Sequence, residues 1–293
     1  MKFKSDNSFS NSKFKLINFE NKIFLRKFLK SVTSRCIDSV KKQNNFKEYK
    51  LNDFDIISAK IKTKSKDIKK KNYYDMQFYY GKNGDEILKS SNIKEIKLLK
   101  DWINKIFFSK KIGNFYRLNP NVFINKLNEI IKNIQKKAFL KIFVKTLIPQ
   151  FKKILTNEKI LYPQNDYCHG DLTLSNIIIN HDKKRLVLID FLQTYNENIV
   201  QDYAKLYQEF KLGWSGRNLD SIKNTRSSII YENIISNYKW NDLDIRLKKA
   251  IIIETHMTLF RILPYLNPND KNTLKWILTS FKSLKRLIKS KKL

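Results

Sequence analysis

The chain begins with two short segments, residues 14–19 and 22–29, in which apolar and polar side chains alternate on either side of the polar pair Glu20-Asn21. Alternation around a two-residue polar turn predicts a β-hairpin. The spacing then changes, and we expect a helix that runs to about Phe46. Three hydroxyl residues at its start are suitable caps: Ser31, Thr33 and Ser34.

Two more strands are expected at residues 55–63 and 72–80, joined by a charged turn around Lys69–Lys71. The pattern becomes helical after the segment "GKNGD" at 81–85, where apolar residues recur every three or four positions. The first two helical stripes contain these residues: Ile93, Ile96, Leu99, Ile103 and Ile106, and then Leu127, Ile130, Ile134 and Ala138. Pro149 is expected to interrupt or end the second helix.

Residues 165–192 break the helical pattern, because "SNIIIN", a polar turn and "RLVLIDF" read as a second hairpin. Helices are expected again from about Ile199 to the end. These patterns predict an α+β fold with two lobes. Residues 1–80 would form a small, mostly β lobe, and residues 81–293 a larger helical lobe that carries the second hairpin.

The charge balance permits two interpretations. The chain of 293 residues has 59 Lys and Arg against 27 Asp and Glu, a formal net charge of +32. Such a surface can bind a polyanion such as nucleic acid. However, only nine of the basic residues are arginine and the lysines are scattered, which favours compositional bias over a nucleic-acid interface.

Two cysteines, Cys36 and Cys168, cannot make a disulfide framework, and this favours a reducing compartment. The first residues contain no apolar segment typical of a secretory signal, and no apolar run is long enough to cross a bilayer. We therefore expect a soluble, cytoplasmic protein.

Candidate chemistry gathers around the second hairpin, in "CHGDLTLSNIIIN" at 168–180 and "RLVLIDF" at 185–191. The hairpin would bring Asp171, Asn176 and Asp190 close together. Phosphoryl transfer requires a carboxylate to orient the attacking hydroxyl, and hard oxygen ligands to hold Mg²⁺ against the nucleotide phosphates. An Asp, an Asn five residues later and an Asp after the next strand supply that set.

These two motifs resemble the catalytic and metal-binding loops of the aminoglycoside phosphotransferase and choline kinase-like family, which has a protein-kinase-like fold. The resemblance implies ATP as co-substrate and Mg²⁺ as cofactor. It further implies that Asp171 is the catalytic base, that Asn176 and Asp190 bind Mg²⁺, and that His169 braces the catalytic loop from behind. Gly170 is typical of the small-molecule branch.

The resemblance extends to other nucleotide-binding stretches. "FSNSKFKL" at 9–16 is similar to a phosphate-covering turn, although it lacks glycine, and "MQFYYG" at 76–81 is similar to the hinge that holds adenine. The residues implied to bind nucleotide are Ser10, Asn11, Ser12, Gln77 and Tyr79. "VQDYAKLYQEF" at 200–210 resembles the helix after the metal-binding loop, with Asp202 as a structural anchor.

The basic residue expected on the third family strand is open between Arg26 and Lys27, which point to opposite faces of the strand. The glutamate expected on the following helix is missing, and only Asp38 lies near its place. A weakened ion pair here leaves a second interpretation open, a degenerate pseudokinase that binds nucleotide or acts as a scaffold.

Other residues carry less specific patterns. His181 is expected to be an exposed turn residue, and His256 has no Cys or His at the spacing of a zinc site. The C-terminal stretch 274–293 predicts an amphipathic basic helix, which either packs on its own domain or contacts an anionic membrane surface peripherally.

The sequence thus predicts an ATP-dependent (or GTP-dependent) kinase that transfers the γ-phosphoryl group to a hydroxyl of a small molecule. Only a short segment separates Phe191 from the helix near Ile199, too short for the peptide groove of a protein kinase, so no protein substrate is expected. The basic charge favours a neutral or anionic acceptor, such as a sugar or a surface-polysaccharide precursor. A nucleic-acid-binding protein is the remaining alternative.

Overall fold

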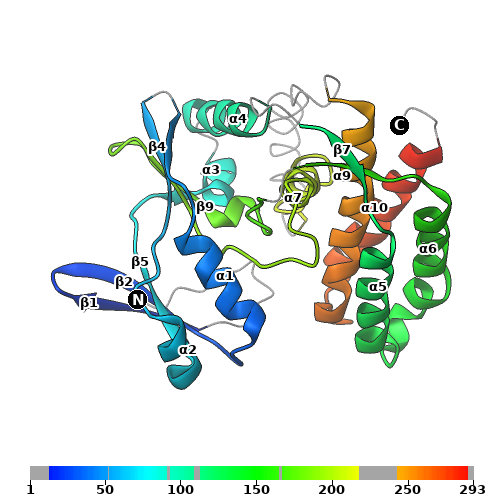
Figure 1. Cartoon of the computed structure of the whole chain (residues 1–293), viewed down its shortest axis with the longest axis horizontal. Helices are drawn as coiled ribbons and strands as arrows, with labels where there is room; N and C mark the ends of the chain where they lie inside the picture. Colours follow the sequence, from blue (N-terminus) through cyan, green and yellow to red (C-terminus); the bar gives the residue numbers. More distant parts are fainter. Residues whose placement is uncertain are drawn as a thin grey trace. The chain divides into compact units, whose positions relative to one another are not determined.

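The computed structural model describes residues 13–51, 53–90, 93–108, 113–164, 167–217 and 243–289, and most of its helices and strands are labelled in Figure 1. The chain divides into two compact units, residues 1–105 with 169–194, and residues 106–168 with 195–293. This division differs from the lobes expected on either side of residue 80, because the second hairpin pairs with strands of the first eighty residues.

The predicted N-terminal hairpin is confirmed in the first unit. Strand β1 (Lys13–Phe19) pairs antiparallel with β2 (Lys22–Phe28), and the two turn residues have positive φ angles, 48° at Glu20 and 58° at Asn21. Positive φ at both central positions matches the right-handed twist of a hairpin. Strand β5 (Tyr73–Gln77) completes the sheet in the order β1-β2-β5.

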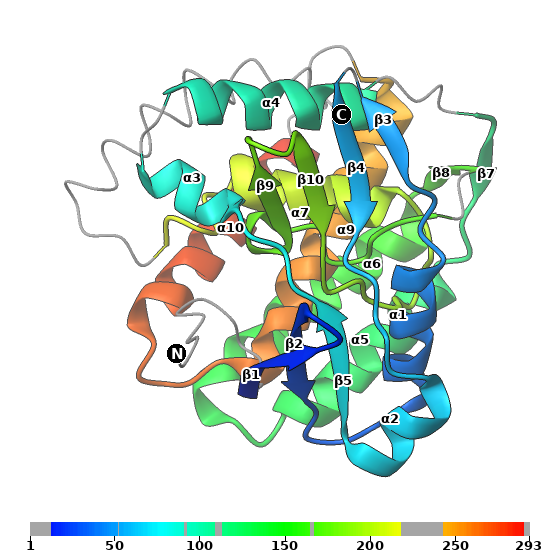
Figure 2. The ribbon, with the colours of Figure 1, turned by 90° about the vertical axis from the view of Figure 1, so that its left-hand side faces the viewer.

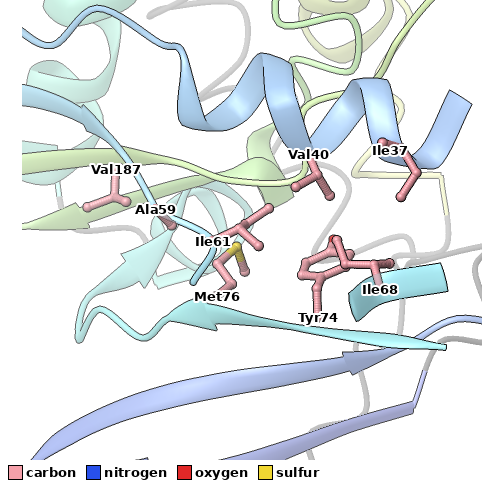
Figure 3. Packing of buried hydrophobic residues seen from close by; sticks show 8 residues of the cluster. All are labelled: Ile37, Val40, Ala59, Ile61, Ile68, Tyr74, Met76 and Val187. Carbon is pink, nitrogen blue, oxygen red and sulfur yellow. The ribbon is translucent and has the colours of Figure 1, made fainter. Parts of the chain in front are cut away.

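Helix α1 (Ser34–Asn44) also forms where the pattern predicts it. Of the candidate caps, Thr33 takes the N-cap position, and its hydroxyl accepts a hydrogen bond from the N–H of Cys36 at 3.3 Å. Ile37 and Val40 on the apolar face of α1 pack into a buried cluster, shown in Figure 3. The other members of the cluster come from residues 59–68, from β5 and from residue 187: Ala59, Ile61, Ile68, Tyr74, Met76 and Val187.

A second sheet of the first unit joins segments far apart in sequence, in the order β3-β4-β10-β9-β6. Strand β4 (Phe54–Ser58) lies parallel to β10 (Arg185–Leu188), which pairs antiparallel with β9 (Ile177–Asn180), as Figure 2 shows. The predicted second hairpin is therefore confirmed. The edge strands are β3 (Tyr49–Leu51) and β6 (Lys82–Asn83).

Two predictions between these strands are wrong. The strand expected at 55–63 ends at Ser58, and the charged turn is helix α2 (Ser65–Lys71). The helix replaces the expected turn because Ile68 is fully buried and anchors α2, while the lysines around it face outward. Helices α3 (Gly84–Ser90) and α4 (Ile93–Phe108) follow, and α4 confirms the first predicted helical stripe.

Where the second unit is described, it is helical apart from the short pair β7 (Phe115–Arg117) and β8 (Leu161–Pro163). The α-helices in this described part are α5 (Asn121–Ile134), α6 (Ile148–Asn157), α7 (Val200–Phe210), α9 (Ile245–Ile262) and α10 (Lys271–Lys289). Shorter turns occupy Ala138–Leu140, Phe143–Leu147 and Leu263–Tyr265. Pro149 does not end the second predicted helix, because α5 ends at Ile134; it lies in the first turn of α6, directly after the π-helical turn Phe143–Leu147.

A buried carboxylate ties three elements of the second unit together. Glu254 on α9 accepts hydrogen bonds from the hydroxyl of Tyr162 on β8 at 2.9 Å and from the side-chain amide of Gln201 on α7 at 2.8 Å. The hydroxyl of Tyr195 also donates to it. Burial raises the pKa of Glu254, while these donors oppose the rise.

The amphipathic helix predicted at the C-terminus forms as α10, and its apolar stripe is buried within the second unit. Ile277, Phe281 and Leu284 are almost inaccessible to solvent, and Phe281 packs against Phe260 of α9 with ring centroids 4.6 Å apart. This packing uses the face that a peripheral membrane contact would require. In the part of the chain that the structure describes, no helix has the length and apolar character of a membrane span.

Candidate active site

The loop that carries Asp171 is held by its own neighbours. The side-chain amide of Asn176 donates to the backbone carbonyl of Asp171 at 2.8 Å and to its carboxylate oxygen Oδ2 at 3.3 Å. The N–H of Thr173 also donates to the Asp171 carbonyl, at 2.8 Å. A short 3₁₀ turn, Leu174–Asn176, then leads into β9. Asp171 and Asn176 therefore form one local unit, with the Asp171 carboxylate only half-buried.

His169 links this loop to the end of β10. Its Nε2 lies 2.8 Å from the carbonyl of Ile189, and its Nδ1 accepts from the N–H of Asp171 at 3.2 Å. Because a carbonyl can only accept and an N–H can only donate, the ring is the neutral tautomer with its proton on Nε2. Burial lowers the pKa of His169 to about 4, although the nearby Asp171 carboxylate opposes this shift. His169 thus ties the Asp171 loop to the backbone of Ile189 through both ring nitrogens.

Gly170 is required by a close approach of two loops. Its φ angle is +85°, and a Cβ atom there would lie 2.1 Å from the carbonyl oxygen of Leu192 and 2.8 Å from Cγ2 of Thr194. Residues other than glycine rarely adopt this backbone conformation, and a Cβ atom does not fit in this space. The glycine lets the His169–Asp171 loop pack against the segment that follows Asp190.

The β9–β10 hairpin brings the second acidic residue to the same place. Ile177 pairs with Leu188, and the N–H of Ile189 donates to the carbonyl of Asn176 at 3.1 Å. Asp190 follows directly, with a φ angle of +56°. A residue other than glycine in this left-handed region is uncommon, and such conformations concentrate at functional sites.

Lys27 pairs with the Asp190 carboxylate. The Lys27 ammonium lies 2.7 Å from Oδ2 of Asp190, and the hydroxyl of Tyr74 lies 3.4 Å from the other carboxylate oxygen. Burial lowers the pKa of Lys27, but Asp190 and Tyr74 outweigh this effect and raise it above the ordinary value. Lys27 therefore remains charged beside Asp190.

Arg26 points to the other face of β2 and makes a separate ion pair. Its guanidinium binds both carboxylate oxygens of Asp75, at 2.7 and 3.0 Å, and lies 3.8 Å from the ring centre of Tyr73. The register explains the difference, because Arg26 is opposite Asp75 and Lys27 is opposite Tyr74 in the β2–β5 ladder. Of the two alternatives, Lys27 is the residue beside the other candidate site residues.

Helix α1 offers no acidic partner to Lys27 among the described residues. Asp38 is exposed and lies 3.5 Å from Lys41 on the same helix. The α1 side chain near Lys27 is Cys36, and burial raises the pKa of its thiol although Lys27 opposes the rise. Lys27, Tyr74 and Cys36 line a cavity of about 220 Å³ with Phe191.

The remaining nucleotide-binding predictions fall into two groups. Ser10, Asn11 and Ser12 lie outside the described residues. At the predicted hinge, the N–H of Gln77 donates to the carbonyl of Lys60 at 2.8 Å, so this donor is already used inside the first unit. Tyr79 packs against the buried cluster, and burial raises the pKa of its hydroxyl.

Sequence reasoning missed Tyr74 and Gln43. Tyr74 lies in the strand expected at 72–80 with no site role assigned to it, and its hydroxyl lies 3.4 Å from a carboxylate oxygen of Asp190. Alternation along 72–80 does place it on the face of Met76. Gln43 is 1% exposed and accepts a hydrogen bond from the N–H of Phe191 at 3.3 Å. The sequence offers one indication of a buried Gln43, since it lies three residues after Val40 and six after Ile37 in the predicted helix.

The side chains present fit a magnesium ion. Asp190 supplies carboxylate oxygens, and because the Nδ2 group of Asn176 is bound to Asp171, the Oδ1 oxygen of Asn176 is the one that can act as a ligand. Mg²⁺ in phosphate-transfer sites uses one or two carboxylates and completes its shell with phosphate and water. Among the residues that the structure describes, no group of three or more His, Cys, Asp and Glu side chains is placed to hold a metal ion.

Comparison with known proteins identifies a kinase-like family. The family model of the RIO domain, a protein-kinase-like atypical kinase domain, matches residues 56–205. The matched region contains Asp171, Asn176 and Asp190, whereas Lys27 precedes it. A search of curated proteins yields no matching sequence. The predicted α+β, protein-kinase-like fold is confirmed, with a β-rich N-terminal region and a helical C-terminal part.

Several solved structures are similar at low sequence identity. Ethanolamine kinase of Plasmodium vivax is 14% identical, with a TM-score of 0.48, and the match covers 96% of this chain and 83% of that one. Spectinomycin phosphotransferase, solved with ADP and spectinomycin, is 14% identical, with a TM-score of 0.41 and coverages of 97% and 88%. A choline/ethanolamine kinase family protein from Mesorhizobium loti is 11% identical, with a TM-score of 0.42 and coverages of 95% and 88%.

Proposed function

The chain belongs to the RIO domain family, and we propose that it is an active phosphotransferase that moves the γ-phosphoryl group of ATP to a hydroxyl group of a small molecule. The observation that carries this proposal is the grouping of Asp171, Asn176 and Asp190 at one end of the β9–β10 hairpin, with Lys27 paired to Asp190. Two carboxylates, an amide oxygen and a fixed cation are the groups that phosphoryl transfer requires.

We assign the roles as follows. The half-buried Asp171 carboxylate would orient the acceptor hydroxyl and take its proton, because it is held by Asn176 at the loop tip and remains accessible. Asn176 Oδ1 and Asp190 would hold Mg²⁺, which when bound neutralises phosphate charge. His169 is neutral and buried, so it would orient Asp171 and transfer no proton.

Lys27 would serve as the phosphate-binding cation. Its ammonium already lies 2.7 Å from a carboxylate that would hold the metal, so a phosphate bound to that metal would meet Lys27 as well. Arg26, paired with Asp75 on the opposite face of β2, is left out of this role. The assignment of a nucleoside triphosphate rests on the family and on these charges.

The acceptor is proposed to be a small neutral or anionic hydroxyl compound, such as a sugar or a surface-polysaccharide precursor. Helix α7 begins at Val200, so only residues 192–199 follow Phe191 before the next helix. This segment is short for a peptide-binding groove. The net charge of +32 favours an acceptor without positive charge. These features support the small-molecule kinase resemblance over a protein substrate.

One observation favours a pseudokinase as the second candidate. Among the described residues of α1, no acidic side chain pairs with Lys27, because Asp38 faces solvent beside Lys41. A kinase with this defect could bind nucleotide without transferring phosphate. Turnover therefore separates the two candidates.

The test compares the wild type with Asp190→Asn and Asp171→Asn in thermal-shift and γ-phosphate transfer assays. We expect ATP to stabilise the wild type only with Mg²⁺, Asp190→Asn to lose this response, and Asp171→Asn to keep it while transfer falls by about 10²–10⁴-fold. Asp182→Asn, in the exposed turn of the same hairpin, is the matched control. Mg-dependent binding without any turnover would favour the pseudokinase, and no response to ATP would contradict both.

A further inference from the structure

One face of helix α1 binds the backbone that follows Asp190. The N–H of Phe191 donates to Oε1 of Gln43 at 3.3 Å, and the carbonyl of Leu192 accepts from the ammonium of Lys42 at 2.9 Å. The N–H of Gln193 donates to the hydroxyl of Ser39 at 2.8 Å, and its carbonyl accepts from Nε of Arg35 at 2.7 Å. Four side chains therefore hold three successive residues.

The spacing of these four side chains is helical. Arg35, Ser39, Lys42 and Gln43 occur at intervals of four, three and one, so they share one side of α1. The neighbouring side carries Ile37 and Val40, which pack into the buried cluster of the first unit (Figure 3). Because this apolar face fixes the rotation of α1, the polar face is presented to residues 191–193 in a defined register.

Gln43 is the buried end of this face. Its side-chain NH₂ group donates to the carbonyl of Ala59 and contacts Sδ of Met76 at 3.2 Å, while its oxygen accepts from Phe191. Gln43 therefore connects α1, the end of β4 and β5 to the residue after Asp190. A buried amide with its donor and acceptor both satisfied is strongly oriented, since breaking either bond leaves a buried polar group unpaired.

The opposite side of the same segment is held by the Asp171 loop. The N–H of Leu192 donates to the carbonyl of His169 at 2.9 Å, and Gly170 allows the two loops to approach each other. Asp190 has a left-handed backbone, and its side chain would lose its direction if the following peptide groups rotated. The conformation of Asp190 is thus set from both sides.

We infer that Arg35, Ser39, Lys42 and Gln43 are positioning residues that hold the Asp190 carboxylate in its metal-binding orientation through the backbone of residues 191–193. This inference rests on the proposed function, because it concerns the use of Asp190 as a metal ligand. It assigns to α1 a structural task that does not require an acidic side chain of α1 beside Lys27. It also makes α1 a fixed part of the site.

The experiment uses Ser39→Ala/Lys42→Met in the full chain, with Lys41→Met on the exposed face of the same helix as the matched control. Amide hydrogen exchange of the ligand-free protein is measured first. We expect the Gln193 amide to exchange about fivefold faster in the double variant, because it loses its acceptor, and to be unchanged in the control. Ser39→Thr, which keeps the hydroxyl, should restore the protection.

The second measurement is the Mg²⁺ concentration that gives half of the ATP-induced thermal stabilisation. We expect it to rise about tenfold in the double variant, with the melting temperature of the ligand-free protein lowered only slightly. Unchanged Mg²⁺ dependence together with faster Gln193 exchange would show that the contacts are purely structural, and would overturn the inference. Unchanged exchange would overturn it directly.

The failure of the proposed function would look different. In that case the wild type itself would show no Mg-dependent response to ATP, while the exchange measurement would still report whether α1 holds residues 191–193. The proposal that α1 positions Asp190 as a metal ligand would then be rejected together with the proposed function.

Discussion

Lys27 and Tyr74 are direct cross-strand neighbours in the β2–β5 ladder, and both of their side chains reach the carboxylate of Asp190. The pairing joins a residue of the N-terminal sheet to Asp190, two residues beyond the end of β10. Because side chains alternate along a strand, Arg26 is directed to the other face, where it binds Asp75. One step of register therefore decides which basic residue meets the candidate metal ligand.

The first prediction concerns this choice. Lys27→Met should reduce γ-phosphate transfer by at least about 100-fold, because it removes the only described cation bound to Asp190 and the charge proposed to meet phosphate. Arg26→Met should have an effect below about threefold, because Arg26 is bound to Asp75. Initial-rate assays at saturating ATP compare the two variants. A larger loss with Arg26→Met would reverse the assignment.

The second prediction concerns Gly170. Gly170→Ala should lower the free energy of unfolding by about 3 kcal/mol or more, since it adds a steric clash with the Leu192 carbonyl to the cost of a left-handed backbone. Gly213→Ala is the matched control, because Gly213 also has a positive φ, +70°, but no atom within 4 Å of an added Cβ. It should cost about 1 kcal/mol. Urea unfolding gives both values, and equal costs would show that the close approach is unimportant.

The third prediction concerns pH. The pKa of His169 is lowered to about 4 in the folded state, below the 6.5 of an ordinary histidine, so the unfolded chain binds more protons between these values. Stability contributed by neutral His169 is complete above pH 6.5, falls as the pH drops towards 4, and the loss is at most about 3 kcal/mol.

The measurement is the free energy of unfolding at pH 7.5 and at pH 5 for the wild type and His169→Gln. The variant should lose less stability between the two pH values than the wild type, because it has no proton to take up at this position. His181→Gln, in the exposed turn of the same hairpin, is the control and should follow the wild type. A variant with the wild-type pH dependence would contradict the prediction.

The fourth prediction concerns the second unit. Glu254→Leu should lower the free energy of unfolding by about 3–5 kcal/mol, because the donors from Tyr162, Tyr195 and Gln201 would remain buried without an acceptor. Glu158→Leu, at an exposed position, should change it by less than about 1 kcal/mol. Chemical unfolding followed by tyrosine and tryptophan fluorescence compares them, and similar values would mean that the buried network contributes little.

Local patterns were sufficient to predict much of the first unit. The turn at Glu20-Asn21, the cap of α1 and the hairpin around 177–188 each depend on residues close in sequence, and each forms as predicted. The order of motifs also placed Asp171, Asn176 and Asp190 at one hairpin. Such features can be predicted from sequence because turn geometry and side-chain alternation depend on only a few neighbouring residues.

Other features depend on partners that lie far away in sequence. Nothing in the alternation of β4 indicates that it pairs with β10, and the short buried anchor Ile68 does not distinguish a helical turn from a loop. The contacts of Ser39 and Gln43 join side chains to backbone groups some 150 residues away, as the separations of 154 and 148 positions show. Long-range hydrogen bonds of this kind produce no periodic pattern of residues in the sequence from which they could be predicted.

The parallel pairing of β4 with β10 has a consequence for synthesis on the ribosome. Residues 106–168 of the second unit come between the two segments of the first, so β4 emerges long before its partner does. Until residues 185–188 are made, one edge of β4 has no strand to pair with, and α1 has no Asp190 loop to hold. Folding of the first unit must therefore wait for a large, non-local loop to close, which slows folding and lengthens the time in which a nascent strand edge is open to chaperones or to other chains.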